Sequence, residues 1–225
     1  DVYKRQAKIK TLDHNAMEIA QKRWDSIAKP LHSLGKLETL LIQIAGITGN
    51  AEVDLSRRGL IAMCADNGVV EEGVTQTGQE VTAIVAENFL KYDTSVGVMC
   101  KQNHAEIFPV DMGMVTDTKV RTDHKIAYGT QNMAKGPAMT REQAVKGLEA
   151  GIDMVRELND KGYRILATGE MGIGNTTTSS AVASVLLKQP VEEMTGRGAG
   201  LTSEGLVRKI NAIKKAIALN EPDPE

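Results

Sequence analysis

The stretch TGEMGIGNTTTSSA, residues 168–181, combines residue types that together could bind an anion and stabilise charge. Its glycines permit a ligand to approach the backbone closely. A helix is predicted to begin directly after them, and amide groups at a helix N-terminus favour a phosphate. The candidate ligand contacts are Gly172, Gly174, Asn175 and Thr176. Glu170 is a candidate assisting group, because a capped tight turn, the alternative interpretation, does not require a carboxylate among glycines.

The pattern of this stretch excludes two common nucleotide-binding motifs. It lacks the lysine of a nucleoside triphosphate loop, and its glycine spacing differs from that of a dinucleotide fingerprint. A second glycine-rich stretch, TGRGAGL at residues 195–201, also precedes a predicted helix. Gly196, Gly198 and Gly200 could form a nest of amides for an anion, with Arg197 or Lys209 as the counter-charge. Two such loops favour a phosphate-bearing ligand, although glycine-rich turns are common.

Polar residues also follow two predicted strands. Asp66 and Asp111 each end an apolar run, and the carboxyl ends of parallel strands lie at one edge of a sheet, where ligands bind. A carboxylate there could bind ribose hydroxyls or stabilise a cationic transition state, but aspartate also initiates turns. Gln79 precedes a predicted helix and could either recognise a heterocyclic nitrogen or cap that helix. Both interpretations stay open for these three residues.

The elements that must position these residues alternate between short apolar runs and longer amphipathic segments, which is typical of a parallel α/β sheet. Strands are predicted at residues 59–65, 105–111 and 163–168, the second weakened by Pro109, which has no amide proton for the sheet. Helices are predicted at residues 11–28, after Ser33 as far as Gly49, and at 79–92, 94–102, 140–161, 176–188 and 203–219. The predicted fold class is α/β, with a parallel Rossmann-like sheet flanked by helices and a smaller helical part at the N-terminus.

The predicted domain organisation has three parts. Residues 7–57 form an N-terminal helical segment, residues 58–219 form the α/β core, and residues 220–225, which contain two prolines, form a tail that leads to a further C-terminal part. Residues 1–6 are excluded from the fold prediction, because their sequence back-translates readily to a transposon end used in preparing sequencing libraries.

The overall composition excludes several classes of protein. With 27 basic and 29 acidic residues the net charge is -2, which gives no electrostatic footprint for nucleic acid or an anionic membrane. No apolar run approaches the length that spans a bilayer. The two cysteines and four histidines lack metal-ligand spacing, so no metal and no cofactor is predicted. These features predict a cytoplasmic protein with small-molecule substrates.

Six sequence blocks together resemble one enzyme family, the nicotinate-nucleotide:dimethylbenzimidazole phosphoribosyltransferases. Beside the two glycine-rich blocks, the resemblance rests on KPLHSLGKLE from residue 29, ADNGV from residue 65, GVTQTGQEVT from residue 73 and GTQNMAKGPAM from residue 129. The blocks follow one another in the order typical of the family across residues 29–201. Each block alone is weak, but their combination is specific.

The resemblance implies transfer of phosphoribosyl from nicotinate mononucleotide to 5,6-dimethylbenzimidazole, giving α-ribazole 5′-phosphate and nicotinate for the nucleotide loop of cobalamin. It also implies a homodimer, a base-pocket contact at Gln79, nucleotide contacts at residues 170–176, and phosphate contacts at the second loop and Lys209. The family's general base is a glutamate in a C-terminal glycine-rich motif that has no match before Glu225. Two alternatives stay open, namely a phosphoribosyltransferase for another base and a catalytically silent nucleotide-binding subunit.

Overall fold

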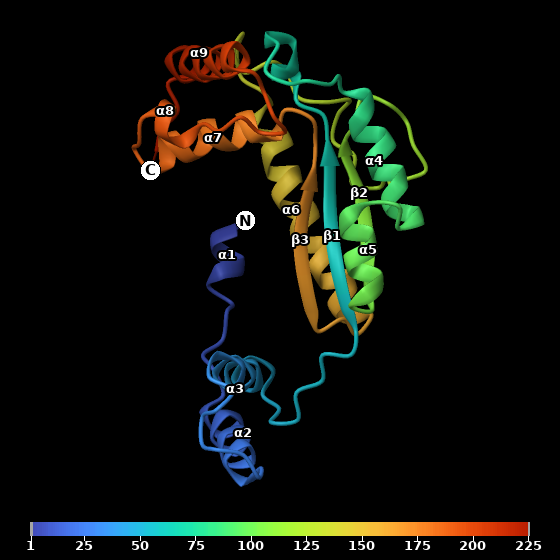
Figure 1. Cartoon of the computed structure of the whole chain (residues 1–225), viewed down its shortest axis with the longest axis vertical. Coiled ribbons are helices and arrows are strands. Elements are labelled where there is room, and N and C mark those ends of the chain that lie inside the picture. The colour runs from blue at the N-terminus through green and yellow to red at the C-terminus, as the bar shows by residue number, and fades with distance from the viewer. Residues whose placement is uncertain (1, 225) are drawn as a thin grey trace. The chain divides into compact units, whose positions relative to one another are not determined.

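The computed structural model describes residues 2–224, with side chains described from residue 4 onward. Asp1, in the segment excluded from the fold prediction, and Glu225, the last residue of the predicted tail, lie outside the described residues. The chain forms two compact units that divide between Arg57 and Arg58. The first is helical and the second contains the sheet, as the chain trace in Figure 1 shows.

The first unit contains α1 (Val2–Gln6), α2 (His14–Ser26) and α3 (Lys36–Thr48). Helix α2 begins at Asp13, whose carboxylate accepts a hydrogen bond from the Ala16 amide at 2.9 Å. Small residues allow α2 and α3 to pack closely. A Cβ placed on Gly46 of α3 would lie 2.7 Å from Met17 Cγ of α2, so this crossing requires glycine.

A buried ion pair closes the turn between these two helices. Glu38 is 3% exposed, forms an ion pair with Lys29 Nζ at 2.8 Å and accepts a hydrogen bond from the Leu34 amide at 3.1 Å. Lys29 and Glu38 are the first and last residues of the KPLHSLGKLE block. That block therefore builds a closed turn in the first unit, because its two ends are held together by charge.

The second unit is built on three parallel strands in the order β2-β1-β3, which confirms the predicted α/β class. They are β1 (Arg58–Ala65), β2 (Ala105–Gly113) and β3 (Ile165–Met171). Pro109 is tolerated because β2 is an edge strand. The predicted third strand, residues 163–168, was wrong in its bounds. Pairing with β1 continues to Met63↔Glu170 and Cys64↔Met171, so Glu170 lies in the strand and not in the loop after it.

Helices cover both faces of the sheet (Figure 1). On one face α4 (Glu80–Lys91) and α5 (Ser95–Gln102) bury Ala86 and Phe89 against Ala62 and Cys64 of β1. On the other face α6 (Arg141–Asp160) buries Met154 and Leu158 against β1 and β2. This arrangement follows from the apolar run of β1, which is central in the sheet and therefore has both faces covered.

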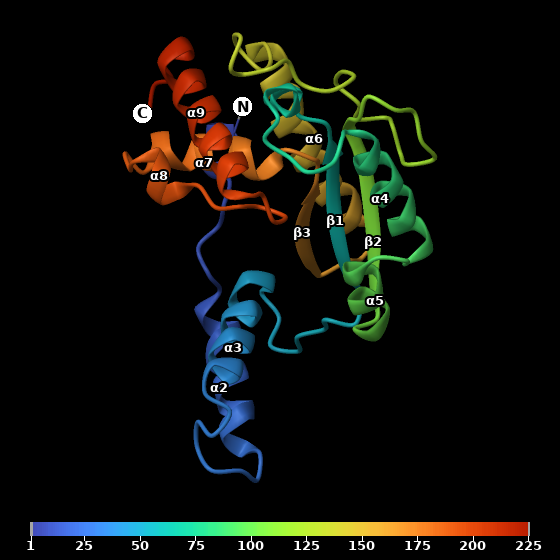
Figure 2. The same cartoon turned by 45° about the horizontal axis from the view of Figure 1, so that its top comes forward.

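The remaining helices gather beside the carboxyl ends of the strands (Figure 2). They are α7 (Asn175–Leu186), α8 (Val191–Met194) and α9 (Ser203–Asn220), and a short 3₁₀ helix, η1 (Gly68–Glu72), follows β1. Ala181, Val191 and Ile213 form the core that joins these three α-helices. Of the helices in the described part of the chain, none is sufficiently long and apolar to cross a membrane.

Candidate anion-binding site

Both glycine-rich loops line one cavity of about 200 Å³ at the carboxyl ends of the strands. Residues 171–176 contribute the end of β3 and the first turn of α7, and residues 197–201 contribute the loop before α9. Residues 74–77, from the loop between η1 and α4, complete the wall. The structure therefore brings together Gly172, Gly174, Asn175, Thr176, Gly198, Gly200 and Lys209 of the residues that the sequence analysis singled out.

Lys209 is the buried cation of this cavity. The residue is 1% exposed, although it lies in an amphipathic helix, because its side chain extends from α9 toward the two loops. Its Nζ donates to Thr176 Oγ1 at 2.7 Å and to the Gly196 carbonyl oxygen at 3.2 Å. Both partners are neutral, and burial lowers the pKa of Lys209 from its ordinary value. A bound anion would supply the missing negative charge.

The close approach of the two loops requires glycine at two positions. Gly174 is the N-cap of α7 and has φ 92°, in the left-handed region that glycine favours. Gly198 has φ 56°, and a Cβ there would lie 2.9 Å from Thr176 Oγ1 and 3.4 Å from Lys209 Nζ. A side chain at residue 198 would thus occupy the space beside the cation. Gly196 contributes its carbonyl oxygen to Lys209 instead of lining the cavity.

Two further side chains brace the loop before α9. Arg197 donates to the Leu201 carbonyl oxygen at 2.8 Å and to Ser203 Oγ at 3.1 Å, so its guanidinium is engaged within its own segment. Gln76 Nε2 donates to the carbonyl oxygen of Gly200 and ties this loop to the segment after η1. Of the two cations considered as a counter-charge, Lys209 is therefore the one held by burial in the cavity wall.

Glu170 stands beside the N-terminus of α7. Its carboxylate accepts a hydrogen bond from Asn175 Nδ2 at 3.0 Å. The residue is exposed, yet protein atoms around the carboxyl group hinder its solvation and raise its pKa, while the Asn175 bond acts in the opposite direction. The raised pKa reflects the atoms around the carboxyl group alone, whereas the exposed area is that of the whole residue. The two observations are therefore compatible. A carboxylate in this position can stabilise a nearby positive charge.

Gln79 does not line the cavity. Its Nε2 donates to the Asn67 carbonyl oxygen at 3.2 Å, which joins the start of α4 to the segment after β1. Asn67 in turn donates from Nδ2 to the Ile173 carbonyl oxygen at 3.1 Å. The base-contact role of Gln79 stays a prediction, and the structure gives this residue a contact with the segment between β1 and η1.

Asp66 and Asp111 are both 0% exposed, and neither lines the cavity. Asp66 Oδ2 accepts from the Val115 amide at 2.8 Å, and burial raises the pKa of this carboxyl group. Asp111 Oδ1 accepts from the Met114 amide at 2.8 Å, and Oδ2 lies 3.1 Å from Lys125 Nζ. These two carboxylates therefore hold the loop after β2 in place. Their geometry does not support a direct contact with ribose.

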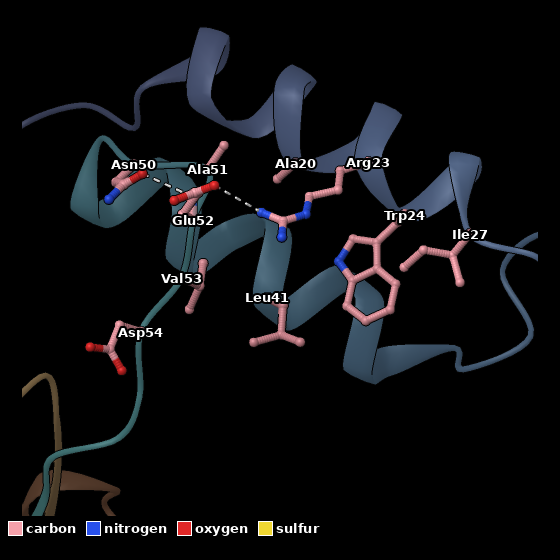
Figure 3. Close-up of a pocket in the computed structure, with 10 residues that line it drawn as sticks. All are labelled: Ala20, Arg23, Trp24, Ile27, Leu41, Asn50, Ala51, Glu52, Val53 and Asp54. Atoms are coloured by element: carbon pink, nitrogen blue, oxygen red, sulfur yellow. Dashed lines mark hydrogen bonds and ion pairs between the residues drawn. The ribbon is translucent and has the colours of Figure 1, made fainter.

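A larger hollow, of about 650 Å³, lies in the first unit between α2 and residues 50–54 (Figure 3). Trp24 and Leu41 form its apolar wall, and Arg23 pairs with Glu52 across it at 3.5 Å. Arg23 and Glu52 neutralise each other there, and the residues that line this hollow include no glycine. The smaller cavity is therefore the stronger candidate, because its buried lysine has no acidic partner among the described residues.

Several residues of this region escaped the sequence analysis. Asn67 and Thr82 belong to two of the quoted blocks, but only their neighbours were singled out. Asn132, in the GTQNMAKGPAM block, donates from Nδ2 to Glu72 Oε1 at 2.7 Å, and Thr130 Oγ1 accepts from the Gly68 amide at 3.0 Å. These residues lie in sequence blocks that are rich in polar side chains, and that enrichment is the signal that could have found them. Their partners are distant in the sequence, so their roles required the tertiary structure.

Comparisons with known proteins agree on one family. A family model described as a phosphoribosyltransferase, DBI_PRT, matches residues 9–225. The nicotinate-nucleotide–dimethylbenzimidazole phosphoribosyltransferase of Ruminiclostridium cellulolyticum is 50% identical over 218 residues, which are 96% of this chain and 62% of that relative. The protein of the same name from Clostridium acetobutylicum is 50% identical over 219 residues, with the same shares.

The structural comparison gives the same result. The crystal structure of CobT from Thermus thermophilus superimposes with a TM-score of 0.83 and 36% sequence identity, covering 93% of this chain and 63% of that chain. The chain thus spans about 62% of the length of the curated relatives that it matches.

Proposed function

This chain belongs to the DBI_PRT family of phosphoribosyltransferases, and from that premise we propose that it takes part in transfer of a phosphoribosyl group. The donor is nicotinate mononucleotide and the acceptor is 5,6-dimethylbenzimidazole. The products are α-ribazole 5′-phosphate and nicotinate, and the reaction serves assembly of the nucleotide loop of cobalamin. The names of the relatives support this choice of substrates.

The observation that carries the proposal is the cavity between the two glycine-rich loops. A phosphate of the donor lies there between the N-terminus of α7 and the loop before α9, with Lys209 as its counter-charge. Amides at a helix N-terminus and a buried ammonium group both favour a phosphate over a neutral ligand. Fixing the phosphate at one end of the sugar holds the anomeric carbon in place for attack.

The chemistry requires three things of the protein. A nitrogen of the benzimidazole must lose its proton to a base, the nitrogen must attack C1′ of the ribose, and the bond from C1′ to the nicotinate nitrogen must break with inversion. Glu170 assists by stabilising positive charge that develops on the ribose, since its carboxylate lies beside the first turn of α7. The general base is proposed to come from a part of the relatives' length that these 225 residues do not span.

The family premise also supports finer proposals. We propose that the protein acts as a homodimer in the cytoplasm, and that its sheet belongs to the Rossmann-like group, since helices cover both faces of parallel strands. Gln79 is proposed to contact the benzimidazole through the part of its amide that does not bind Asn67.

Thermal unfolding with and without ligands tests the donor assignment. Nicotinate mononucleotide should raise the melting temperature, because a ligand that binds only the folded state stabilises it. Lys209→Met should abolish most of this shift, whereas Lys215→Met, at an exposed site of the same helix, should keep it. An unchanged melting temperature of the wild-type chain at millimolar nucleotide would refute the proposal.

Product formation tests the reaction itself. The chain is incubated with nicotinate mononucleotide and 5,6-dimethylbenzimidazole, and α-ribazole 5′-phosphate is measured by chromatography beside the Clostridium acetobutylicum relative as a positive control. Loss of a general base typically lowers a rate by about 10²- to 10⁴-fold, so we expect the chain to be slower than the relative by that order. Equal rates would place the base within these residues, with Glu170 as the first candidate.

A further inference from the structure

Thr82 connects two segments that are distant in the sequence but adjacent at the candidate site. The residue lies in the first turn of α4 and is 0% exposed, and it does not line the cavity. Its Oγ1 accepts a hydrogen bond from the Ile173 amide at 3.0 Å. Ile173 lies between the two glycines that precede α7, so the bond holds the segment from which that helix begins.

The same hydroxyl group acts on the carboxylate of Asp66. Asp66 Oδ2 accepts a hydrogen bond from the Val115 amide at 2.8 Å, and Oδ1 is buried without a hydrogen-bond partner among the described residues. The Thr82 hydroxyl lowers the pKa of Asp66, against the effect of burial. A hydroxyl group donates one proton and accepts at its lone pairs. Thr82 accepts from the Ile173 amide and keeps one hydroxyl proton that it can donate.

The Ile173 peptide is held from both sides. Its carbonyl oxygen accepts from Asn67 Nδ2 at 3.1 Å, while its amide donates to Thr82. The neighbouring Gly172 passes close to the end of β1, because a Cβ there would lie 2.2 Å from the Ala65 carbonyl oxygen, so this position requires glycine. These contacts determine where Gly174, the N-cap of α7, places the first amides of the helix.

We propose that Thr82 is a positioning residue of the anion site, which holds the Ile173 peptide so that the N-terminus of α7 faces the phosphate. The proposal rests on the proposed function for the location of that phosphate. Thr82 touches no substrate itself. It links the first turn of α4 to the loop that binds the anion.

Two substitutions separate the hydroxyl group from the shape of the side chain. Thr82→Val keeps the volume but leaves the Ile173 amide without its acceptor, whereas Thr82→Ser keeps the hydroxyl group. Ser184→Ala is the matched control, because Ser184 is a buried residue of α7 whose hydroxyl group has no hydrogen-bond partner among the described residues. If Thr82→Val does not fold, Thr82→Cys serves in its place, since a thiol is a weak donor and acceptor.

The 225-residue chain and these variants are titrated with inorganic phosphate and with nicotinate mononucleotide by calorimetry. Loss of one buried hydrogen bond typically shifts an equilibrium about tenfold, or 1.4 kcal/mol, so Thr82→Val should bind both ligands about tenfold more weakly. Thr82→Ser should stay within about threefold of wild type. Amide hydrogen exchange at residues 173–176 should be faster in Thr82→Val and unchanged in Ser184→Ala.

Each outcome decides between the two proposals. Thr82→Val with wild-type affinity and unchanged exchange would refute the role of Thr82 while leaving the proposed function intact. Equal losses in Thr82→Val and Thr82→Ser would refute the role of the hydroxyl group, since only the shape of the side chain would then matter. Tight binding of phosphate with no binding of the nucleotide would contradict the proposed function, while the Thr82 comparison with phosphate would still support or overturn its own proposal.

Discussion

Replacement of Lys209 by methionine separates the binding role of the buried cation from its contribution to folding. Methionine has a similar length and no charge, so it can fill the same space in α9. In the ligand-free chain the ammonium group belongs to a residue that is 1% exposed, and it has two neutral partners, Thr176 Oγ1 and the Gly196 carbonyl oxygen. The substitution therefore removes two hydrogen bonds together with a charge that burial disfavours.

The substitution should therefore change ligand affinity strongly and stability little. A hydrogen bond to a charged group contributes about 1.5–3 kcal/mol, so phosphate affinity should fall roughly 10- to 150-fold in Lys209→Met. The free energy of unfolding should change by less than about 1 kcal/mol, because relief of the buried charge offsets the lost hydrogen bonds. Calorimetry with inorganic phosphate measures the first quantity, and urea unfolding of the ligand-free chain measures the second.

The pH dependence of stability gives an independent check. The pKa of Lys209 is lower in the folded chain than its ordinary value of 10.5. Between these two values the unfolded chain binds more protons, so this residue makes stability rise with pH. Lys209→Met should lack that component, and Lys215→Met, at an exposed site, should retain it. Wild-type phosphate affinity in Lys209→Met would refute the assignment of Lys209 as the counter-charge of the anion.

Three further substitutions test other parts of the site. Gln79→Ala should weaken benzimidazole binding by about 1–3 kcal/mol and nucleotide binding less, as titration of each ligand would show. Gly172→Ala should lower the free energy of unfolding by about 1–3 kcal/mol in urea, because the new Cβ would lie 2.2 Å from the Ala65 carbonyl oxygen. Glu170→Gln should remove a component of stability that falls as pH rises from about 4.5 through the raised pKa of Glu170, because the folded chain binds more protons in that window.

Each of these experiments has a control and a contradicting result. Equal losses of both ligands in Gln79→Ala would mean that this residue supports the fold through Asn67. Gly151→Ala is the control for Gly172→Ala, since a Cβ at Gly151 meets nothing within 4 Å, and equal stability of the two variants would contradict the close contact. A Glu170→Gln variant with the pH profile of the wild type would show that this carboxyl group has an ordinary pKa.

The sequence by itself was sufficient for the order and class of the three strands and of the longer helices, whereas the short helices η1 and α8 were not predicted. The apolar runs of β1 and β2 and the helical periodicity of α4, α5, α6 and α9 are local patterns, so their positions followed from residue spacing. Glycine-rich segments before two helices also predicted loops suited to an anion. The alternation of strands with helices predicted a parallel sheet with the first of these loops at the carboxyl end of a strand, where the structure finds it, whereas the meeting of the second loop with the first appeared only in the structure.

Only the tertiary structure decided which side chains meet. The end of β3 depended on its register with β1, which extended the strand to Met171 and included Glu170. The burial of Asp66 and Asp111 beneath the loop after β2 depended on where that loop folds back, and so did their separation from the cavity. Such features arise from contacts between residues that are far apart in the sequence, as in the bonds from Val115 to Asp66 and from Ile173 to Thr82, and no local period records them.

Lys209 is a single residue for which the sequence predicted one property and the tertiary structure decided another. Its place in a helix after a glycine-rich loop made it one of two candidate counter-charges, beside Arg197, and gave no sign of its burial. The packing of α9 beside α7 turns that side chain inward, between Thr176 and Gly196, and makes it a buried cation without an acidic partner among the described residues. Residue type and spacing therefore indicated an anionic ligand, whereas packing determined which cation is buried in the cavity wall, because burial and pairing are properties of the folded chain alone.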